Sequence, residues 1–141
     1  MRTLALDLGR RRIGLAISDE LGITAQGLPT IQRKNNRTDL AELARIVRER
    51  AVELILIGNP LHMSGDAGTQ AENARLFGEM VTQRLGKQVR LWDERLTTVE
   101  ASRVLRDSGI SIEKRARAVD QLSAVILLQS YLDFLAEGGS A

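Results

Sequence analysis

The sequence predicts an α/β domain: a mixed five-stranded sheet with helices on both faces. Two apolar runs, residues 4–8 and 13–17, flank a short glycine-led turn rich in arginine, which is typical of a β-hairpin. A third antiparallel strand over residues 28–31 would complete a meander. Two further apolar runs, 54–58 and 89–92, each follow a helical pattern, so they can join the first strand in parallel through right-handed crossovers.

Helical spacing of apolar residues predicts the two helices between these strands. Asp39 with Glu42 indicates the start of the first helix, which is expected to end near Arg50. Thr69 with Glu72 indicates the start of the second. Gly86 would end this second helix, and its inward stripe consists of Ala74, Phe77, Val81 and Leu85.

Two more helices are expected after the last strand. Thr97 with Glu100 predicts a short helix that ends near Gly109, and residues 110–117 are expected to form a basic loop. The final helix is expected to begin close to Asp120. Its inward face would carry Val119, Leu122, Val125, Ile126, Gln129 and Leu132.

Length and composition predict one soluble domain. The 141 residues, 43% of them hydrophobic, suffice for a single domain over residues 1–141, whose tail at 137–141 is expected to fray. The chain has no cysteine, which excludes disulfides and thiolate metal sites. Its apolar runs are too short to span a bilayer and no secretory pattern opens the sequence, so we expect a cytoplasmic protein without a membrane partner.

The basic residues are informative by their placement rather than by their number. Twenty basic against 18 acidic residues give a net charge of only +2, which does not by itself indicate a polyanionic partner. One such cluster alone is most simply a solvated loop, but several near the ends of elements favour a surface that faces phosphates. The aromatic content of 3% argues against a platform for stacking bases. The clusters are residues 10–12; Arg33, Lys34 and Arg37; and Lys114, Arg115 and Arg117.

Three carboxylates fall where chemistry could use them. Asp7 interrupts the first strand, Glu94 follows the last strand, and Asp120 lies among apolar residues at the expected start of the final helix. If helices cover both faces of the sheet, Asp7 needs a cation nearby, either an arginine of the turn or a metal ion. Simpler roles stay open: Asp7 could pair with Arg12, Glu94 with Arg95, and Asp120 could be a capping residue favoured by the helix dipole.

This set of residues suits a two-metal mechanism. Clustered carboxylates repel unless a cation intervenes, and Mg²⁺ or Mn²⁺ prefers their oxygens. Two such ions, about 3.5–4 Å apart, can activate a water and stabilise the leaving oxygen of a phosphodiester. This chemistry needs neither cysteine nor histidine. The single histidine, His62, lies in a long polar loop over residues 59–68, where it would face substrate or solvent, and the role of this loop stays open.

Four blocks of the sequence resemble the YqgF, or RuvX, family of Holliday junction resolvases and pre-16S rRNA nucleases. They occur in the family's order and together cover nearly the whole chain. Because that family is similar to RuvC-type resolvases, the resemblance implies a ribonuclease H-like fold. The blocks are DLGRRRIGLAISD at 7–19, GNP at 58–60 with MSG at 63–65, DERLTT at 93–98, and VDQLSAVILLQ at 119–129.

The resemblance implies a hydrolase that cleaves phosphodiester bonds in structured nucleic acid, at the 5′ end of precursor 16S rRNA. It also implies that Asp7, Glu94 and Asp120 are the acidic residues that bind the divalent metal. Departures from the family's pattern at Arg10, Asn59, Ser64 and Ser123 lie beside the site, so they bear on substrate preference rather than on the reaction. The nucleic acid is expected to contact Arg10, Arg12, Arg95, Lys114 and Arg115.

Other functions remain to be separated from this one. Resolution of four-way DNA junctions uses the same chemistry, and coordinated cutting of two strands would favour a homodimer. The strand-turn-strand at Asp7 also resembles the phosphate loop of actin-like ATP-binding phosphotransferases, although those enzymes use two domains and a second glycine-rich motif. A binding module without turnover is a third alternative, against which the three retained acids argue.

Overall fold

The computed structural model describes residues 1–59, 67–93 and 112–139 of the chain. The predicted short helix at 97–109 and the greater part of the polar loop at 59–68 lie outside these residues. The elements follow in the order β1 (Thr3–Leu8), β2 (Arg12–Ser18), β3 (Ala25–Gln32), α1 (Asn36–Glu49), β4 (Leu54–Asn59), α2 (Ala67–Leu85), β5 (Gln88–Asp93) and α4 (Ile112–Ala136).

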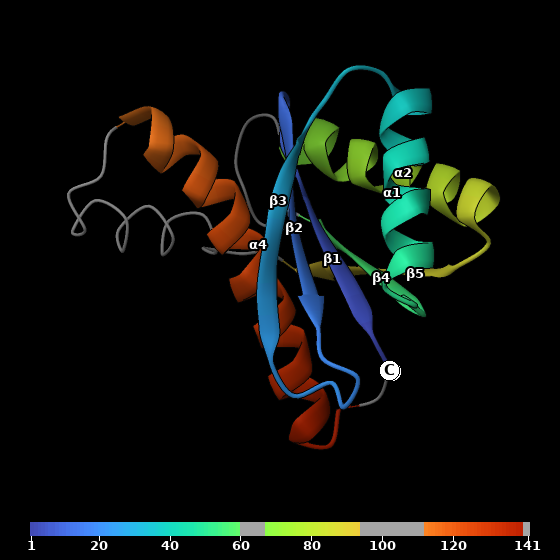
Figure 1. Cartoon of the computed structure of the whole chain (residues 1–141), viewed down its shortest axis with the longest axis vertical. Helices are drawn as coiled ribbons and strands as arrows, with labels where there is room; N and C mark the ends of the chain where they lie inside the picture. The colour runs from blue at the N-terminus through green and yellow to red at the C-terminus, as the bar shows by residue number, and fades with distance from the viewer. Residues whose placement is uncertain (60–66, 94–111, 140–141) are drawn as a thin grey trace.

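The five strands form one mixed sheet in the order β3-β2-β1-β4-β5 (Figure 1). β1 pairs antiparallel with β2, and β2 with β3, whereas β4 pairs parallel with both β1 and β5. The predicted fold class is therefore confirmed. β3 is longer than predicted, and its pairing with β2 shifts register between Ile13 and Leu15, which marks a β-bulge.

The sheet separates two apolar cores. Leu4 and Leu6 of β1 are fully buried in the core that α1 and α2 cover, whereas Ala5 is fully buried in the core under α4 (Figure 1). This alternation follows from the two-residue period of a strand. It places Asp7, two residues after Ala5, on the face that α4 covers.

The first two helices begin earlier than predicted. The side chain of Asn35 accepts a hydrogen bond from the main-chain nitrogen of Thr38 at 2.8 Å and so caps α1, four residues before Asp39. The prediction that Asp39 starts the helix was wrong because its carboxylate is used in a tertiary contact. α2 begins at Ala67, two residues before Thr69, so the predicted capping box there is also wrong.

The ends of α1 and α2 agree with the predictions. Arg50 is the C-cap of α1, and Gly86, with φ of +66°, follows the last residue of α2. The left-handed conformation at Gly86 is one that glycine adopts without steric cost. The predicted inward stripe of α2 is confirmed, since Ala74, Phe77 and Val81 are buried and Leu85 packs against them.

The last helix differs most from its prediction. α4 begins at Ile112, so Lys114 and Arg115 lie in a helix rather than a basic loop, and Asp120 lies in its third turn rather than its first. The run of Glu, Lys, Arg and Ala at 113–117 consists of strong helix formers. The buried face is also different from the predicted one: it consists of Ser123, Ala124, Leu127, Leu128, Tyr131 and Leu132.

α4 ends in a hydrogen-bonded cap. The main-chain nitrogen of Gly138 donates to Leu135, and that of Gly139 donates to Phe134, which is the Schellman pattern. Gly138 has φ of +92°, where glycine is favoured. The part of the tail up to Gly139, expected to fray, is thus hydrogen-bonded to the helix. Of the helices in the described part of the chain, none is both long and apolar enough to cross a membrane.

Candidate active site

The candidate active site lies where the three parallel strands end. β1, β4 and β5 run in the same direction, so their carboxyl ends meet at one edge of the sheet (Figure 1). Such edges are where open α/β sheets bind ligands. Asp7 is the fifth residue of the six-residue strand β1 and is partly buried there, opposite Gly14 of β2.

Asp7 begins a row of residues that crosses the parallel strands. The last paired residues of β1 and β4 are Leu6 and Ile57, so Asp7 comes level with Gly58 on the next step, and Gly58 pairs with Trp92 of β5. Neighbouring strands are about 4.8 Å apart, which puts β1 and β5 about 10 Å from one another. Because Gly58 has no side chain, β4 adds none to this row.

Aromatic packing fixes the end of β5 against α4. The ring of Trp92 lies edge-on to the rings of Tyr131 and Phe134, with 5.1 Å between centroids in each pair. Its Nε1 donates to Ser130 Oγ at 3.3 Å. Trp92 is therefore a partly buried member of the α4 core. Asp93 ends the strand, and Glu94, the next residue in the chain, lies outside the described residues.

Two glutamines fix α4 along β3. Gln121 Nε2 donates to the carbonyl oxygen of Leu28 at 2.9 Å, and Gln129 Oε1 accepts from the main-chain nitrogen of Ala25 at 3.2 Å. Helical spacing alone placed Gln129 on one face with apolar residues and gave no sign of the role of Gln121. Position 120 lies one helical turn before the fully buried Ala124, whose cluster includes Ala5 of β1. The side chain of Asp120 is outside the described set.

One arginine, Arg33, donates hydrogen bonds to two residues of the turn between β1 and β2. Arg33 Nη1 donates to the carbonyl oxygen of Gly9 at 2.9 Å, and the main-chain nitrogen of Arg33 donates to Arg11 at 2.8 Å. Within the turn, Gly9 donates to Arg12 at 2.9 Å, and a Cβ at position 9 would lie only 2.8 Å from that carbonyl oxygen. A glycine is therefore required two residues after Asp7.

A buried carboxylate accompanies this arginine. Asp39 is 1% exposed, its Oδ1 accepts from the main-chain nitrogen of Lys34 at 3.2 Å, and its Oδ2 lies 3.7 Å from Arg33 Nε. The guanidinium also lies over the ring of Phe77, 5.6 Å from its centroid. This cluster was not predicted from the sequence, where Asp39 stood out only as an acidic residue at the expected start of a helix.

The predicted contacts for nucleic acid are only partly described. Arg10 is exposed and Arg12 half-buried, both in the hairpin next to Asp7. Arg95 lies outside the described residues, and Lys114 and Arg115 are placed on α4 by their backbone alone. Among the side chains that the structure describes, no group of three acids or histidines could hold a metal ion, and neither Glu94 nor Asp120 belongs to that set.

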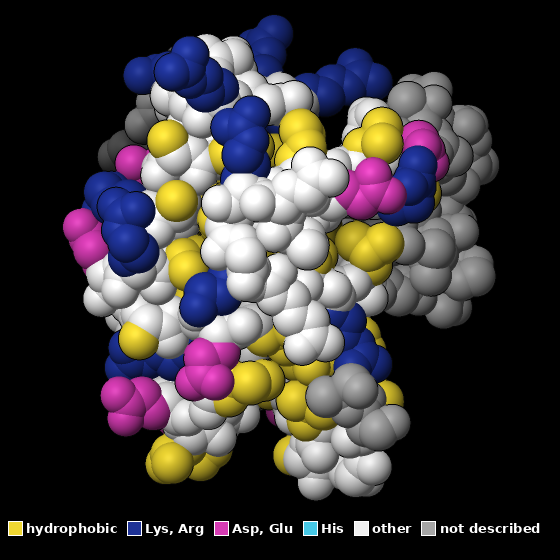
Figure 2. Space-filling view, turned by 90° about the vertical axis from the view of Figure 1, so that its right-hand side faces the viewer, with side chains coloured by type: hydrophobic (Ala, Val, Ile, Leu, Met, Phe, Trp, Pro, Cys, Tyr) yellow, Lys and Arg dark blue, Asp and Glu magenta, His cyan; other side chains and the backbone are white. Residues whose placement is uncertain are grey.

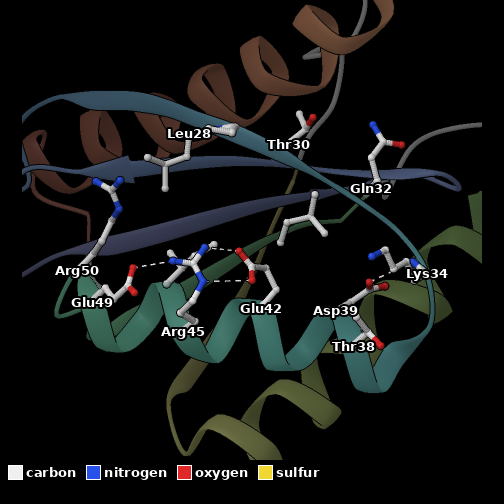
Figure 3. Close-up of a pocket in the computed structure, with 13 residues that line it drawn as sticks. Leu28, Thr30, Gln32, Lys34, Thr38, Asp39, Glu42, Arg45, Glu49 and Arg50 are labelled. Carbon is white, nitrogen blue, oxygen red and sulfur yellow. Dashed lines mark hydrogen bonds and ion pairs between the residues drawn. The ribbon is translucent and has the colours of Figure 1, made fainter.

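One pocket of about 430 Å³ lies elsewhere, between β3 and α1 (Figure 3). Its charged lining is balanced: Asp39, Glu42 and Glu49 against Lys34, Arg45 and Arg50. Arg45 is itself paired with Glu42 and Glu49, and these contacts lower the pKa of Glu42 and raise that of Arg45. The pocket is on the α1 side of the sheet, whereas Asp7 is on the α4 side, so it is not the candidate active site.

The fold is ribonuclease H-like. It is similar to that of RuvC from Thermus thermophilus in complex with a Holliday junction substrate, with a TM-score of 0.64 and 11% identity, covering 98% of this chain and 97% of that one. The Fowlpox virus resolvase, in complex with Holliday junction DNA, gives a TM-score of 0.56 and 12% identity, over 96% of this chain and 99% of that one. At such identities the likeness shows the fold alone.

The chain belongs to the RuvX family. The family model, described as "RuvX: Holliday junction resolvase", matches residues 1–134. A relative from Koribacter versatilis is 53% identical over 132 residues, which cover 94% of this chain and 86% of the relative. One from Moorella thermoacetica is 46% identical over 139 residues, 99% of each chain. Both are named as proposed pre-16S rRNA nucleases.

Proposed function

We propose that this protein is a divalent-metal-dependent nuclease that processes the 5′ end of precursor 16S rRNA. The observation that carries the proposal is the position of Asp7 at the carboxyl end of β1, on the α4 face, in a row that continues through the side-chain-free Gly58 toward the end of β5. The names of relatives that share about half of the residues support the substrate.

In this proposal Asp7, Glu94 and Asp120 hold the metal. They come from three separate elements or their ends: β1, the residue after β5, and α4. Carboxylate oxygens are the donors that Mg²⁺ and Mn²⁺ prefer, so this set of donors fits a hard divalent ion. When bound, a pair of such ions supplies Lewis-acid activation of water and stabilisation of the leaving oxygen.

The residues of the chain itself position the metal-binding carboxylates and bind the substrate. Asp7 is held in a strand with partners on both sides, so its carboxylate is supported by rigid elements rather than by a loop. Gly58 contributes no side chain to β4 between Asp7 and β5. In this proposal Arg10 and Arg12, in the hairpin next to Asp7, bind flanking phosphates and set the register of the strand, together with Arg95, Lys114 and Arg115.

A four-way DNA junction is the second candidate substrate. The description of the matching family favours it, and the chemistry at the scissile phosphate would be the same. Resolution of a junction requires two coordinated cuts, for which a two-fold homodimer would be suited. Family membership argues against the ATP-binding phosphotransferase alternative. The dimer, and the cytoplasm as the place of action, stay predictions.

The decisive experiment compares Asp7→Asn with Glu53→Gln. Both changes remove one negative charge with little change in shape, but Glu53 is exposed just before the first residue of β4, at the other end of the sheet. Each variant is assayed with Mg²⁺ or Mn²⁺ on an RNA spanning the 5′ end of 16S rRNA and on a four-way DNA junction. We expect Asp7→Asn to lose cleavage by 10³-fold or more, on the order of what removal of one essential catalytic group costs.

Each outcome separates the alternatives. Cleavage of the RNA but not of the junction supports rRNA processing, and the reverse supports junction resolution. Equal cleavage by Asp7→Asn and the unsubstituted protein would contradict the assignment of Asp7. Absence of cleavage of both substrates by the unsubstituted protein, with binding intact, would favour a module without turnover.

A further inference from the structure

The turn after β1 and the loop before α1 form one unit at the active-site end. Arg33 joins them, since its side chain donates to Gly9 and its main chain donates to Arg11. The register continues this pairing, with Arg12 opposite Gln32. Residues 9–12 and 33–37 therefore lie side by side, although more than 20 positions separate them in the chain.

Three exposed basic side chains project from this unit: Arg11 in the turn, Lys34 in the loop, and Arg37 in the first turn of α1. We call these three the basic strip. Within the described residues, no carboxylate oxygen lies within 4 Å of any of their charged groups. The acids closest in sequence are already engaged, because Asp39 is buried beside Arg33 and Glu42 pairs with Arg45.

The basic strip lies at the end of the molecule that carries Asp7. In Figure 1 the turn after β1 and the loop before α1 are both at the top, where β1 and β4 end. Figure 2 shows Lys and Arg side chains gathered along that upper end, on the side of α1 and α2. Like charges that lie together repel one another, which makes a polyanionic partner favourable there.

We propose that the basic strip binds the phosphate backbone of the nucleic acid beyond the cleaved bond. The strand would pass from the acidic site on the α4 side, over the glycine turn, to Arg11, Lys34 and Arg37 on the α1 side. This inference rests on the proposed function and adds a phosphate-binding surface on the opposite side of the sheet. The contacts of the half-buried Arg33 with the buried Asp39 and with Gly9 hold the two halves of the basic strip next to one another.

The test measures binding rather than cleavage. The triple variant Arg11→Gln, Lys34→Gln, Arg37→Gln is compared with a control, Arg48→Gln, Arg84→Gln, Lys87→Gln. Both remove three positive charges, which takes the formal net charge from +2 to −1. Arg48 and Arg84 lie in the last turns of α1 and α2, away from the active-site end. Labelled four-way DNA and labelled precursor rRNA are titrated with Ca²⁺ in place of Mg²⁺, over a series of salt concentrations.

Loss of three phosphate contacts should reduce the slope of log K against log salt by about 2–3 for the duplex arms of the junction, and the control should change it by less than about 1. Affinity at low salt should fall at least tenfold relative to the control. A lower affinity and a lower salt slope for only one of the two substrates supports the basic strip and identifies the nucleic acid that it binds. Equal slopes and equal affinities for the two triple variants would overturn the proposal.

This outcome is separable from that of the proposed function. If Asp7→Asn abolishes cleavage while the two triple variants bind alike, the nuclease assignment stands and the basic strip is wrong. If Asp7→Asn cleaves normally while the strip variant binds weakly, the surface stands and the catalytic assignment is wrong.

Discussion

The Nε of Arg33 lies 3.7 Å from Oδ2 of Asp39, a distance that makes an ion pair but not a hydrogen bond. Oδ2 has no hydrogen-bond donor among the described residues, although Asp39 is 1% exposed. The charge of Arg33 is therefore the principal compensation for that buried oxygen. The same guanidinium donates to Gly9, so one side chain connects α1, the ring of Phe77 and the turn beside Asp7.

We expect the Arg33–Asp39 pair to be strongly coupled. Arg33→Met leaves a buried carboxylate without a cation and should lower the free energy of unfolding by about 2–4 kcal/mol, and Asp39→Asn should cost less because it keeps an acceptor for Lys34. The double variant should be less destabilised than the sum of the two by at least ~1 kcal/mol in urea titrations. Strictly additive losses would contradict the coupling.

An exposed ion pair on α1 provides the control for the single and double variants of Arg33 and Asp39. Arg45 is paired with Glu49, and both side chains are about half exposed. Solvent screens such pairs, so Arg45→Met and Glu49→Gln should each lower the free energy of unfolding far less than Arg33→Met does. A loss as large as that of Arg33→Met would mean that burial does not account for the difference.

Metal binding should depend on the contact between Gly27 and Gln121. A Cβ at position 27 would lie 2.7–2.9 Å from side-chain atoms of Gln121, which donates to Leu28. Gly27→Ala should displace this glutamine, the neighbour of Asp120, and reduce the rise in melting temperature caused by Mn²⁺. Ligand that binds the folded state alone stabilises by about 2.7 kcal/mol at 100 times its Kd, so the loss is measurable.

Gln129→Ala serves as the control for Gly27→Ala. It removes the second link between α4 and β3, to Ala25, at a site two turns further along the helix. The melting temperature itself should fall, but the Mn²⁺-dependent increment should persist. Equal increments in Gly27→Ala and Gln129→Ala would show that the link at Gln121 has no special connection to metal binding.

The single tryptophan reports on the end of β5. Trp92 is the only tryptophan in the sequence and lies two residues before Glu94. Metal binding at the acidic site should therefore change its fluorescence, with saturation as Mg²⁺ is added. The change should disappear in Asp7→Asn and persist in Glu53→Gln. A response that Asp7→Asn leaves intact would place the metal elsewhere.

Acid stability should depend on Asp19. Its carboxylate accepts hydrogen bonds from the main-chain nitrogens of Ile23 and Thr24, at 2.7 and 3.1 Å, and these bonds lower its pKa. A lowered folded pKa means that the contribution to stability is present above the unfolded pKa, about 3.9, and is lost as pH falls through the folded value. Asp19→Asn should flatten the acid limb of stability against pH between about 2 and 4.

That prediction is checked by urea unfolding at a series of pH values and by an NMR titration of the Asp19 carboxyl. Glu53→Gln, which removes an exposed acid at the same end of the sheet, is the control for the loss of one negative charge. An NMR pKa at or above the ordinary aspartate value would contradict the role of the two main-chain bonds.

Local pattern predicted the sheet because strand signals are short-range. The apolar runs at Leu4 and Leu54 are typical of buried strands, and the helical pattern between them allows parallel pairing by a right-handed crossover. The alternation around Asp7 also follows from the strand period alone, so its face could be stated from the sequence. The family blocks implied a metal-binding role for Asp7, Glu94 and Asp120, but not the distances between them.

The boundaries and buried faces of the helices were harder to predict, because the sequence around them allows several helix starts and several buried faces. α4 is apolar nearly all round from Leu122 to Leu128, so spacing could not select its buried face. The small side chain of Ala124 allows close approach to the sheet, and Tyr131 packs on Trp92, which belongs to a distant strand. α1 begins earlier than predicted because Asn35 caps it, whereas Asp39 forms an ion pair with Arg33.

The sequence by itself determined the order of elements, the strand that bears Asp7 and the face on which it lies, because periodicity and chain order suffice for these. Only the tertiary structure decided that Arg33 and Asp39 are partners, that α4 turns Ala124 and Tyr131 inward, and that the two basic segments meet beside the turn. Those relationships depend on which residues become neighbours when the sheet closes between its helices, and no local spacing encodes that choice.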